Sequence, residues 1–205
     1  MIDILAVFIT FFAVIDPIGT VPVFIAVTDQ YDAKTKRRVA LLATIVSACV
    51  LLFFLVMGEV VLTALSIPLP AFQISGGIVL FLFALNMIFG DSKPDEEIKL
   101  LEDSHRQTAI FPLAVPSIAS PGAMLAAVLL TKNSVFTFWE QVQTALVMLS
   151  VLVLVYVLML IAGFINRVVG SSGASVISRI MGLILSSVAT TNILTGLSEY
   201  YNQAL

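Results

Sequence analysis

The chain contains very little of the side-chain chemistry on which most enzyme active sites depend. Its 205 residues include one cysteine, one histidine and one tryptophan, and charged residues make up only 11%. A single cysteine, Cys49, cannot form an intramolecular disulfide or act with a resolving thiol. The lone His105 lies far along the chain from Cys49, so the two do not predict a zinc site. We therefore expect no metal and no cofactor.

The apolar segments also lack the groups that acid/base catalysis needs. They contain no histidine, one cysteine and few carboxylates, which disfavours a membrane-embedded enzyme. The chain has no phosphate-binding glycine motif of the P-loop type, so we do not expect ATP to drive its activity directly. The net charge of −3 arises largely from one loop and gives no indication of nucleic-acid binding.

What the chain has in abundance is apolar sequence. Hydrophobic residues make up 60% and the mean hydropathy is +1.09. A helix needs about 20 apolar residues to cross about 30 Å of hydrocarbon. We expect an all-α membrane protein with six transmembrane segments, of which the first shows no basic n-region or cleavage pattern of a signal peptide. The predicted segments are 4–28, 38–64, 71–89, 109–131, 141–166 and 174–198.

The basic residues predict the orientation of these segments. Nine of the ten Lys and Arg residues lie in or beside alternate connections, and only Lys132 lies on the other side. The positive-inside rule then places both termini outside the cytoplasm, in a multi-pass protein of the cytoplasmic (inner) membrane. Re-entrant first and fourth segments would change this charge bias only slightly, so charge does not separate that alternative from six full crossings.

The order of features suggests two repeats. Each half has a broken segment, then a long apolar segment, then a segment with an early glycine and a late asparagine. Three crossings per repeat require opposite orientations, which gives an inverted repeat, as in many secondary transporters. We expect repeats at 1–90 and 109–205, joined by an acidic cytoplasmic linker at 91–108. At an offset of about 104 to 106 residues the repeats pair Pro17 with Pro121, Gly58 with Gly163, Gly76 with Gly182 and Asn86 with Asn192.

Two helix breaks define the candidate site. Asp16 precedes Pro17 and Ser120 precedes Pro121, and an N-capping side chain before proline predicts that a helix starts there. Both lie about 18 Å into their segments, near the bilayer centre. Each break would leave helix N-termini to hold a carboxylate, and carbonyl groups beside Asp16 to hold an ammonium group. Such breaks persist in a membrane only where they line a cavity or pack against protein.

The sequence therefore supplies a set of candidate site residues. Asp16 is an ionisable group at bilayer depth, which suits it to substrate binding or proton coupling. The expected substrate-binding residues are Asp16, Pro17, Gly19, Thr20, Ser120, Pro121, Gly122, Ala123, Asn86 and Asn192. Asp16, Glu59 and Arg179 are the candidates for gating or coupling. In the simpler alternative the prolines only kink the helices, Asp16 only caps its half-helix and the asparagines only join helices.

Two stretches of the sequence carry a family resemblance. At Ile15-Asp16-Pro17-Ile18-Gly19-Thr20-Val21-Pro22-Val23-Phe24 and at 111–123 the chain resembles the MarC family of bacterial and archaeal membrane proteins. The resemblance covers essentially the whole chain. It implies a relative of the SnatA-type transporters of glycine, alanine, serine or threonine, within the LysE-like superfamily. Many members of that family have glycine where this chain has Ser120.

The expected function is a secondary transporter of small neutral amino acids, acting as an exporter or exchanger by alternating access. A proton or sodium ion is the expected coupling partner, the lipid bilayer surrounds the protein, and a homo-oligomer is left open. The first alternative is a passive channel for a small polar solute, which would show flux without saturation or counterflow. A structural or partner-regulating membrane protein is the second, and it would tolerate Asp16→Asn.

Overall fold

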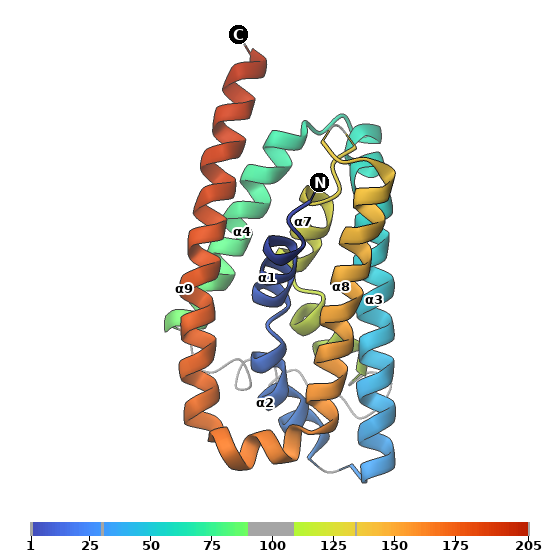
Figure 1. Cartoon of the computed structure of the whole chain (residues 1–205). Coiled ribbons are helices and arrows are strands. Elements are labelled where there is room, and N and C mark those ends of the chain that lie inside the picture. The colour runs from blue at the N-terminus through green and yellow to red at the C-terminus, as the bar shows by residue number, and fades with distance from the viewer. Residues whose placement is uncertain (1, 30, 90–108, 134, 205) are drawn as a thin grey trace.

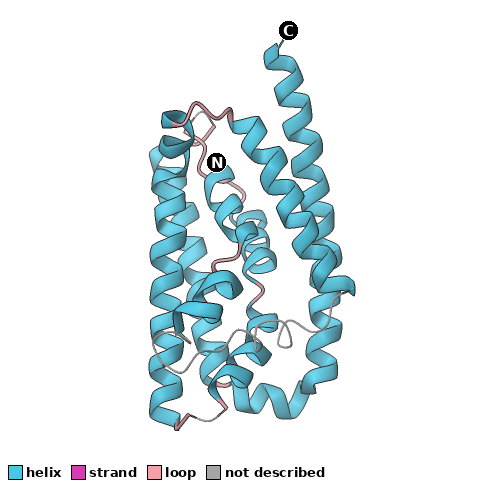
Figure 2. Ribbon diagram, turned by 180° about the vertical axis from the view of Figure 1, so that it is seen from behind, coloured by secondary structure: helices cyan, strands magenta, loops and turns pink. Residues whose placement is uncertain are grey.

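Every element of the computed structural model is a helix within the residues that it describes, which are 2–29, 31–89, 109–133 and 135–204. The elements are α1 (Ile4–Ile15), α2 (Pro17–Thr28), α3 (Ala33–Ala64), α4 (Leu69–Phe89), η1 (Ala109–Ile118), α7 (Pro121–Leu129), α8 (Phe138–Leu160) and α9 (Ala162–Ala204) (Figures 1 and 2). The predicted acidic linker at 91–108, with His105, lies outside the described residues.

Polar residues cap the starts of five helices, including the two predicted starts at Asp16 and Ser120. Asp3, Asp16, Asp32, Ser120 and Thr137 each accept a hydrogen bond from a backbone N–H in the first turn of the helix that follows. These bonds satisfy N–H groups that have no partner inside the helix. At α8 the side chain of Glu140 also accepts from the backbone N–H of Thr137, which completes a capping box.

Four stretches of the described residues are long and apolar enough to cross a membrane. They are Ile4–Val21, which includes the first break, Ala33–Ala64, Leu69–Phe89 and Phe138–Leu160. The largest difference from the predicted segment bounds lies between α8 and α9. We predicted a connection near residues 167–173, whereas α8 ends at Leu160 and α9 begins at Ala162. Gly170 and Gly173 therefore lie within a helix, since glycine keeps its N–H donor and costs only about 1 kcal/mol there.

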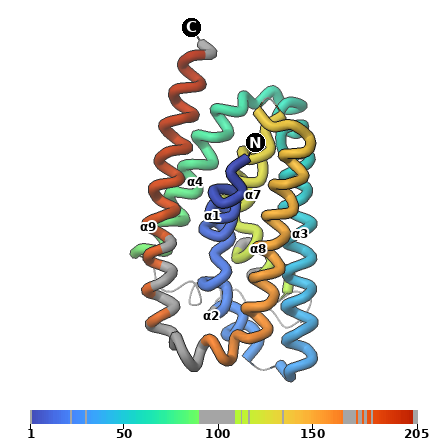
Figure 3. Tube along the Cα trace, viewed as in Figure 1, coloured from blue at the N-terminus to red at the C-terminus, as the bar shows by residue number. Residues whose placement is uncertain are grey.

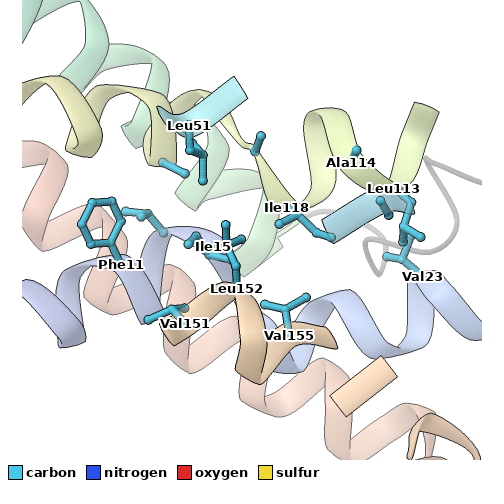
Figure 4. Packing of buried hydrophobic residues seen from close by; sticks show 14 of the residues in the cluster. Phe11, Ile15, Val23, Leu51, Leu113, Ala114, Ile118, Val151, Leu152 and Val155 are labelled. Atoms are coloured by element: carbon cyan, nitrogen blue, oxygen red, sulfur yellow. The ribbon is translucent and has the colours of Figure 1, made fainter. Parts of the chain in front are cut away.

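The two broken segments lie in the middle of the bundle. α3 packs against η1 and α7, while α8 packs against α1 and α2. Buried side chains from all of these elements form the core, including Phe11 and Ile15 of α1, Leu51 of α3, Ile118 of η1 and Leu152 of α8 (Figure 4). Apart from the exposed Pro121, the residues of the two breaks, Asp16, Pro17 and Ser120, are thus enclosed by protein.

α4 and α9 form an antiparallel pair on one side of the bundle (Figures 1 and 3). Glycines bring their backbones together. A Cβ atom built on Gly77 would lie 3.1 Å from the carbonyl oxygen of Ala189, and one on Gly182 would lie 3.0 Å from that of Ala84. Each contact has its counterpart in the other half of the chain. Gly182 lies 105 residues after Gly77, and Ala189 lies 105 residues after Ala84, so the glycine of each helix meets the equivalent alanine of the other.

The ends of the bundle carry different parts of the chain. Figure 1 shows both termini, the α3–α4 turn and the α7–α8 turn toward the upper end, and the α2–α3 and α8–α9 turns at the lower end. The basic residues that begin α3, namely Lys34, Lys36, Arg37 and Arg38, therefore lie at the lower end, and Lys132 of the α7–α8 turn lies at the upper end.

Candidate functional site

The first helix break is centred on Asp16. This residue ends α1 and caps α2, and its backbone has the left-handed conformation with φ 51° and ψ 67°. Its Oδ1 atom accepts a hydrogen bond of 3.0 Å from the backbone N–H of Gly19. Its carbonyl oxygen accepts from both the backbone N–H and the hydroxyl of Thr20, at 3.1 and 3.0 Å. Asp16 is buried, at 1% exposure, and both its carboxylate and its carbonyl oxygen accept hydrogen bonds from the first turn of α2.

The conformation of Asp16 is strained. A residue before proline normally adopts an extended conformation, because the proline ring restricts its backbone. Left-handed backbone costs a non-glycine residue of the order of 1 kcal/mol or more, although aspartate and asparagine tolerate it best. Surrounding contacts must therefore hold Asp16 in place, and strain of this kind concentrates at binding sites and switches.

Gly19 makes room for the Asp16 carboxylate. A Cβ atom on Gly19 would overlap that carboxylate, lying 2.7 Å from Cγ and 3.0 Å from Oδ1. No side chain fits here without moving Asp16, so the glycine allows the carboxylate to sit over the first turn of α2. There the positive end of the helix dipole stabilises negative charge.

The second break is built differently. Ser120 has an ordinary extended backbone, with φ −70° and ψ 158°, as expected for a residue before proline. The preceding segment η1 is not one regular helix, because Phe111 and Val115 have extended backbone and interrupt it. Each of these two residues also precedes a proline, Pro112 and Pro116, which accounts for the irregularity.

The structure brings the two breaks together. The Ser120 hydroxyl donates a 2.9 Å hydrogen bond to the carbonyl oxygen of Val14, in the last turn of α1. The same oxygen atom accepts a hydrogen bond of 3.1 Å from the backbone N–H of Ala123, and this bond caps α7. Ser120 thus joins the first turn of α7 to the last turn of α1, across 106 residues of sequence.

Small residues surround this junction. Ser120, Gly122 and Ala123 are buried, whereas Pro121 is exposed. The side chain of Leu80 from α4 covers Gly122 at the position a Cβ atom would occupy. Pro17, Gly19 and Thr20 are buried on the other side of the junction, in the first turn of α2. The start of α7, the end of α1 and the Asp16 carboxylate therefore lie in a close-packed region with little room for large side chains.

The remaining candidates lie elsewhere. Asn86 is exposed on α4 and Asn192 is partly exposed on α9, and the register of that helix pair places them toward its opposite ends. Glu59 accepts a 2.7 Å hydrogen bond from the backbone N–H of Asn133 in the α7–α8 turn. Arg179 is exposed on α9. The structure thus gathers the residues of the two breaks but leaves the asparagines, Glu59 and Arg179 apart from them.

Sequence reasoning missed two parts of the junction. The carbonyl of Val14 carries no side-chain signal, and Leu80 is one of many leucines. The role of Ser120 in joining the breaks was also not foreseen, because capping alone explained its position. Only the predicted inverted repeat, with one break in each half, indicated that the two breaks would lie close together.

The length and apolar composition of the helices define the class of the protein, which is an integral membrane protein. The profile described as MarC family integral membrane protein matches residues 1–201. The chain is 30% identical over 201 residues to a UPF0056 membrane protein of Buchnera aphidicola subsp. Schizaphis graminum, covering 98% of this chain and 99% of the relative. The chain belongs to the MarC family.

Distant organisms carry similar proteins. Identity is 32% over 192 residues with a UPF0056 membrane protein of Methanocaldococcus jannaschii, covering 93% of each chain. It is 32% over 205 residues with the UPF0056 membrane protein YvbG of Bacillus subtilis, covering 97% of this chain and 95% of the relative. No solved structure matches the chain. The names of these relatives state membrane location and no substrate.

Proposed function

We propose that the protein is a secondary transporter of small neutral amino acids in the cytoplasmic membrane, acting as an exporter or exchanger. Its site lies where the two helix breaks meet, and access alternates between the two sides of the membrane. The observation that carries the proposal is the hydrogen bond from Ser120 to the Val14 carbonyl, because it joins the breaks beside the buried carboxylate of Asp16.

Six crossings in two inverted repeats are part of this proposal. The reciprocal contacts of Gly77 with Ala189 and of Gly182 with Ala84 support it, because a two-fold axis between α4 and α9 would generate the same pairs. The packing of the other helices follows the same rule. α3 packs on the second broken segment, and α8 packs on the first. Both termini and Lys132 would then lie outside the cytoplasm, opposite the basic start of α3.

The chemistry of the junction suits a zwitterion. A buried carboxylate is costly unless a positive charge or a proton neutralises it. The ammonium group of an amino acid would bind at the Asp16 carboxylate, and a coupling proton would bind there when the substrate is absent. The N-terminal turns of α2 and α7 supply positive dipole ends for the substrate carboxylate. The glycines and alanines around them favour a substrate with a small side chain.

In this proposal Asp16 both caps α2 and binds the substrate or the proton. One carboxylate oxygen holds the start of α2 through Gly19, and the carboxylate as a whole supplies the charge for substrate or proton binding. Substrate release would weaken the attraction that keeps the two breaks together, and this gives the strained Asp16 backbone a part in the conformational change. No chemical step on the substrate is proposed.

The competing functions predict different fluxes. A passive channel would conduct without saturation and without exchange of internal for external solute. A structural or partner-regulating protein would show no flux at all. The enclosed, close-packed junction favours a carrier over an open channel, because in the described residues the core between the breaks is filled by buried side chains.

Counterflow in proteoliposomes tests the proposal. Vesicles preloaded with unlabelled glycine, alanine, serine or threonine are diluted into labelled substrate, and entry of label is followed with and without the internal load. Saturable entry that requires the internal amino acid supports the carrier. Absence of counterflow for all four amino acids, with monodisperse protein in the vesicles, would eliminate the amino acid substrate class.

A further inference from the structure

Outside the junction, three polar side chains from separate elements meet at the upper end of the bundle. The ammonium group of Lys132, in the α7–α8 turn, donates a 3.2 Å hydrogen bond to Oε1 of Gln73 on α4. The same nitrogen lies 3.6 Å from Oε2 of Glu199 on α9. We call Lys132, Gln73 and Glu199 the Lys132 latch.

The Lys132 latch is more enclosed than an ordinary surface ion pair. The Lys132 side chain is 12% exposed and Gln73 is buried at 5%, while the Glu199 side chain is 44% exposed. Loss of the ammonium group would therefore remove the donor from a buried amide oxygen as well as an ion pair. Two further contacts hold the same turn to α3. The Thr131 hydroxyl donates to the Leu55 carbonyl at 3.1 Å, and the Asn133 N–H donates to Glu59.

The partners of Lys132 belong to one rigid pair of helices. α4 and α9 are joined backbone to backbone at Gly77 and Gly182. At the upper end, a Cβ atom on Gly196 would likewise lie 3.0 Å from the Pro70 carbonyl. Backbones this close have no room to rearrange, so α4 and α9 move together. Gln73 and Glu199, one on each helix, mark the upper part of this pair.

The contact between α4 and α7 is of a different kind. There the side chains of Leu125 and Leu80 fill the spaces above Gly76 and Gly122. Flexible leucine side chains against glycine can separate or slide without breaking a backbone contact. The boundary between α7 and the α4–α9 pair is therefore the place where the upper half of the bundle can open, and the Lys132 latch spans it.

We infer that the Lys132 latch is a gate that closes the upper end of the path to the junction. This inference rests on the proposed transport function. Opening toward the upper side requires Lys132 to leave Gln73 and Glu199, and closing restores both contacts. At the offset of 104 to 106 residues that relates the two halves, the residues equivalent to Lys132 are Thr28, Val27 and Ala26, so an inverted copy of the Lys132 latch cannot form there with a lysine. The two ends of the path would thus be closed by different means, which gives the transporter a preferred facing direction.

The test measures opening without relying on any substrate. Cys49 is exposed and is first replaced by serine, and Leu125→Cys then places a single reporter thiol on α7 against Gly76. Intact cells and inverted membrane vesicles that carry the full chain are treated with a membrane-impermeant maleimide. The labelling rate is compared among this parent, Lys132→Gln, Glu199→Gln and the charge swap Lys132→Glu with Glu199→Lys. Lys34→Gln, an exposed lysine at the other end, is the matched control.

We expect Lys132→Gln to raise the labelling rate about fivefold from the side of the α7–α8 turn, equivalent to about 1 kcal/mol. The charge swap should return the rate to within about twofold of the parent, and Lys34→Gln should leave it unchanged. Unchanged rates in both Lys132→Gln and Glu199→Gln would overturn the inference. An equal increase from both sides would also overturn it, because that result indicates general loosening.

Two controls make the outcomes decisive. If Lys132→Gln is not monodisperse on size-exclusion chromatography, the partly exposed Glu199→Gln alone decides, with the same expected direction. Counterflow is measured on the same variants without the reporter. A labelling response without counterflow keeps the Lys132 latch and rejects the amino acid proposal, whereas counterflow without a labelling response rejects the latch and keeps the transporter.

Discussion

Gly19→Ala should destabilise the first break, although alanine is the better helix former. Glycine to alanine in a helix usually stabilises by about 0.5 to 1 kcal/mol. Here the new methyl group would overlap the Asp16 carboxylate, whose Oδ1 atom accepts from the Gly19 N–H. Displacing a buried carboxylate from its cap costs about 1.5 to 3 kcal/mol. The net effect should be a loss of about 1 to 2 kcal/mol.

The matched control is Gly163→Ala. Gly163 also lies near the start of a helix, and a Cβ atom there meets nothing within 4 Å. This variant should be neutral or slightly more stable than the parent. The assay is denaturant unfolding in detergent, compared with the parent at matched detergent concentration. A Gly19→Ala protein as stable as Gly163→Ala would refute the argument that Gly19 exists to accommodate Asp16.

Two further predictions concern the junction and the proposed repeat. Ser120→Ala removes both the cap of α7 and the bond to the Val14 carbonyl, and should cost about 1 to 3 kcal/mol in detergent unfolding. Ser120→Gly should lose the bond to Val14 while keeping most of the capping preference, so a cost equal to that of Ser120→Ala would assign the effect to the bond. Gly77→Ala and Gly182→Ala should destabilise the protein equally, to within about 0.5 kcal/mol, because an inverted repeat makes their surroundings equivalent. Clearly unequal effects would argue against equivalent halves.

The fold was predictable where the sequence carries local signals. Asp16 and Ser120 each combine a capping side chain with a following proline, and both breaks occur at those residues. The left-handed backbone of Asp16 was not predictable, because residues before proline usually avoid it. The irregularity of η1 was predictable in principle from Pro112 and Pro116, because a proline favours extended backbone in the residue before it.

Two other features, the helical stretch at 167–173 and the Lys132 latch, depend on packing between helices, which the local sequence does not indicate. The stretch 167–173 is helical rather than a loop, because α9 continues through its polar residues and glycines. The Lys132 latch joins three elements far apart in the sequence. From the sequence, Lys132 indicates only the orientation of the chain in the membrane. Its partners Gln73 and Glu199 cannot be identified without the register of α4 and α9.

The most direct test of the central claim is counterflow by Asp16→Asn beside Asp29→Asn. Asparagine caps helices as well as aspartate and tolerates left-handed backbone, so Asp16→Asn removes the charge while preserving the break. Asp29 is an exposed acidic residue and serves as the matched control. The account predicts that Asp16→Asn folds normally and loses counterflow, while Asp29→Asn keeps it. Full counterflow in a folded Asp16→Asn protein would contradict a transport site at the junction of the two breaks.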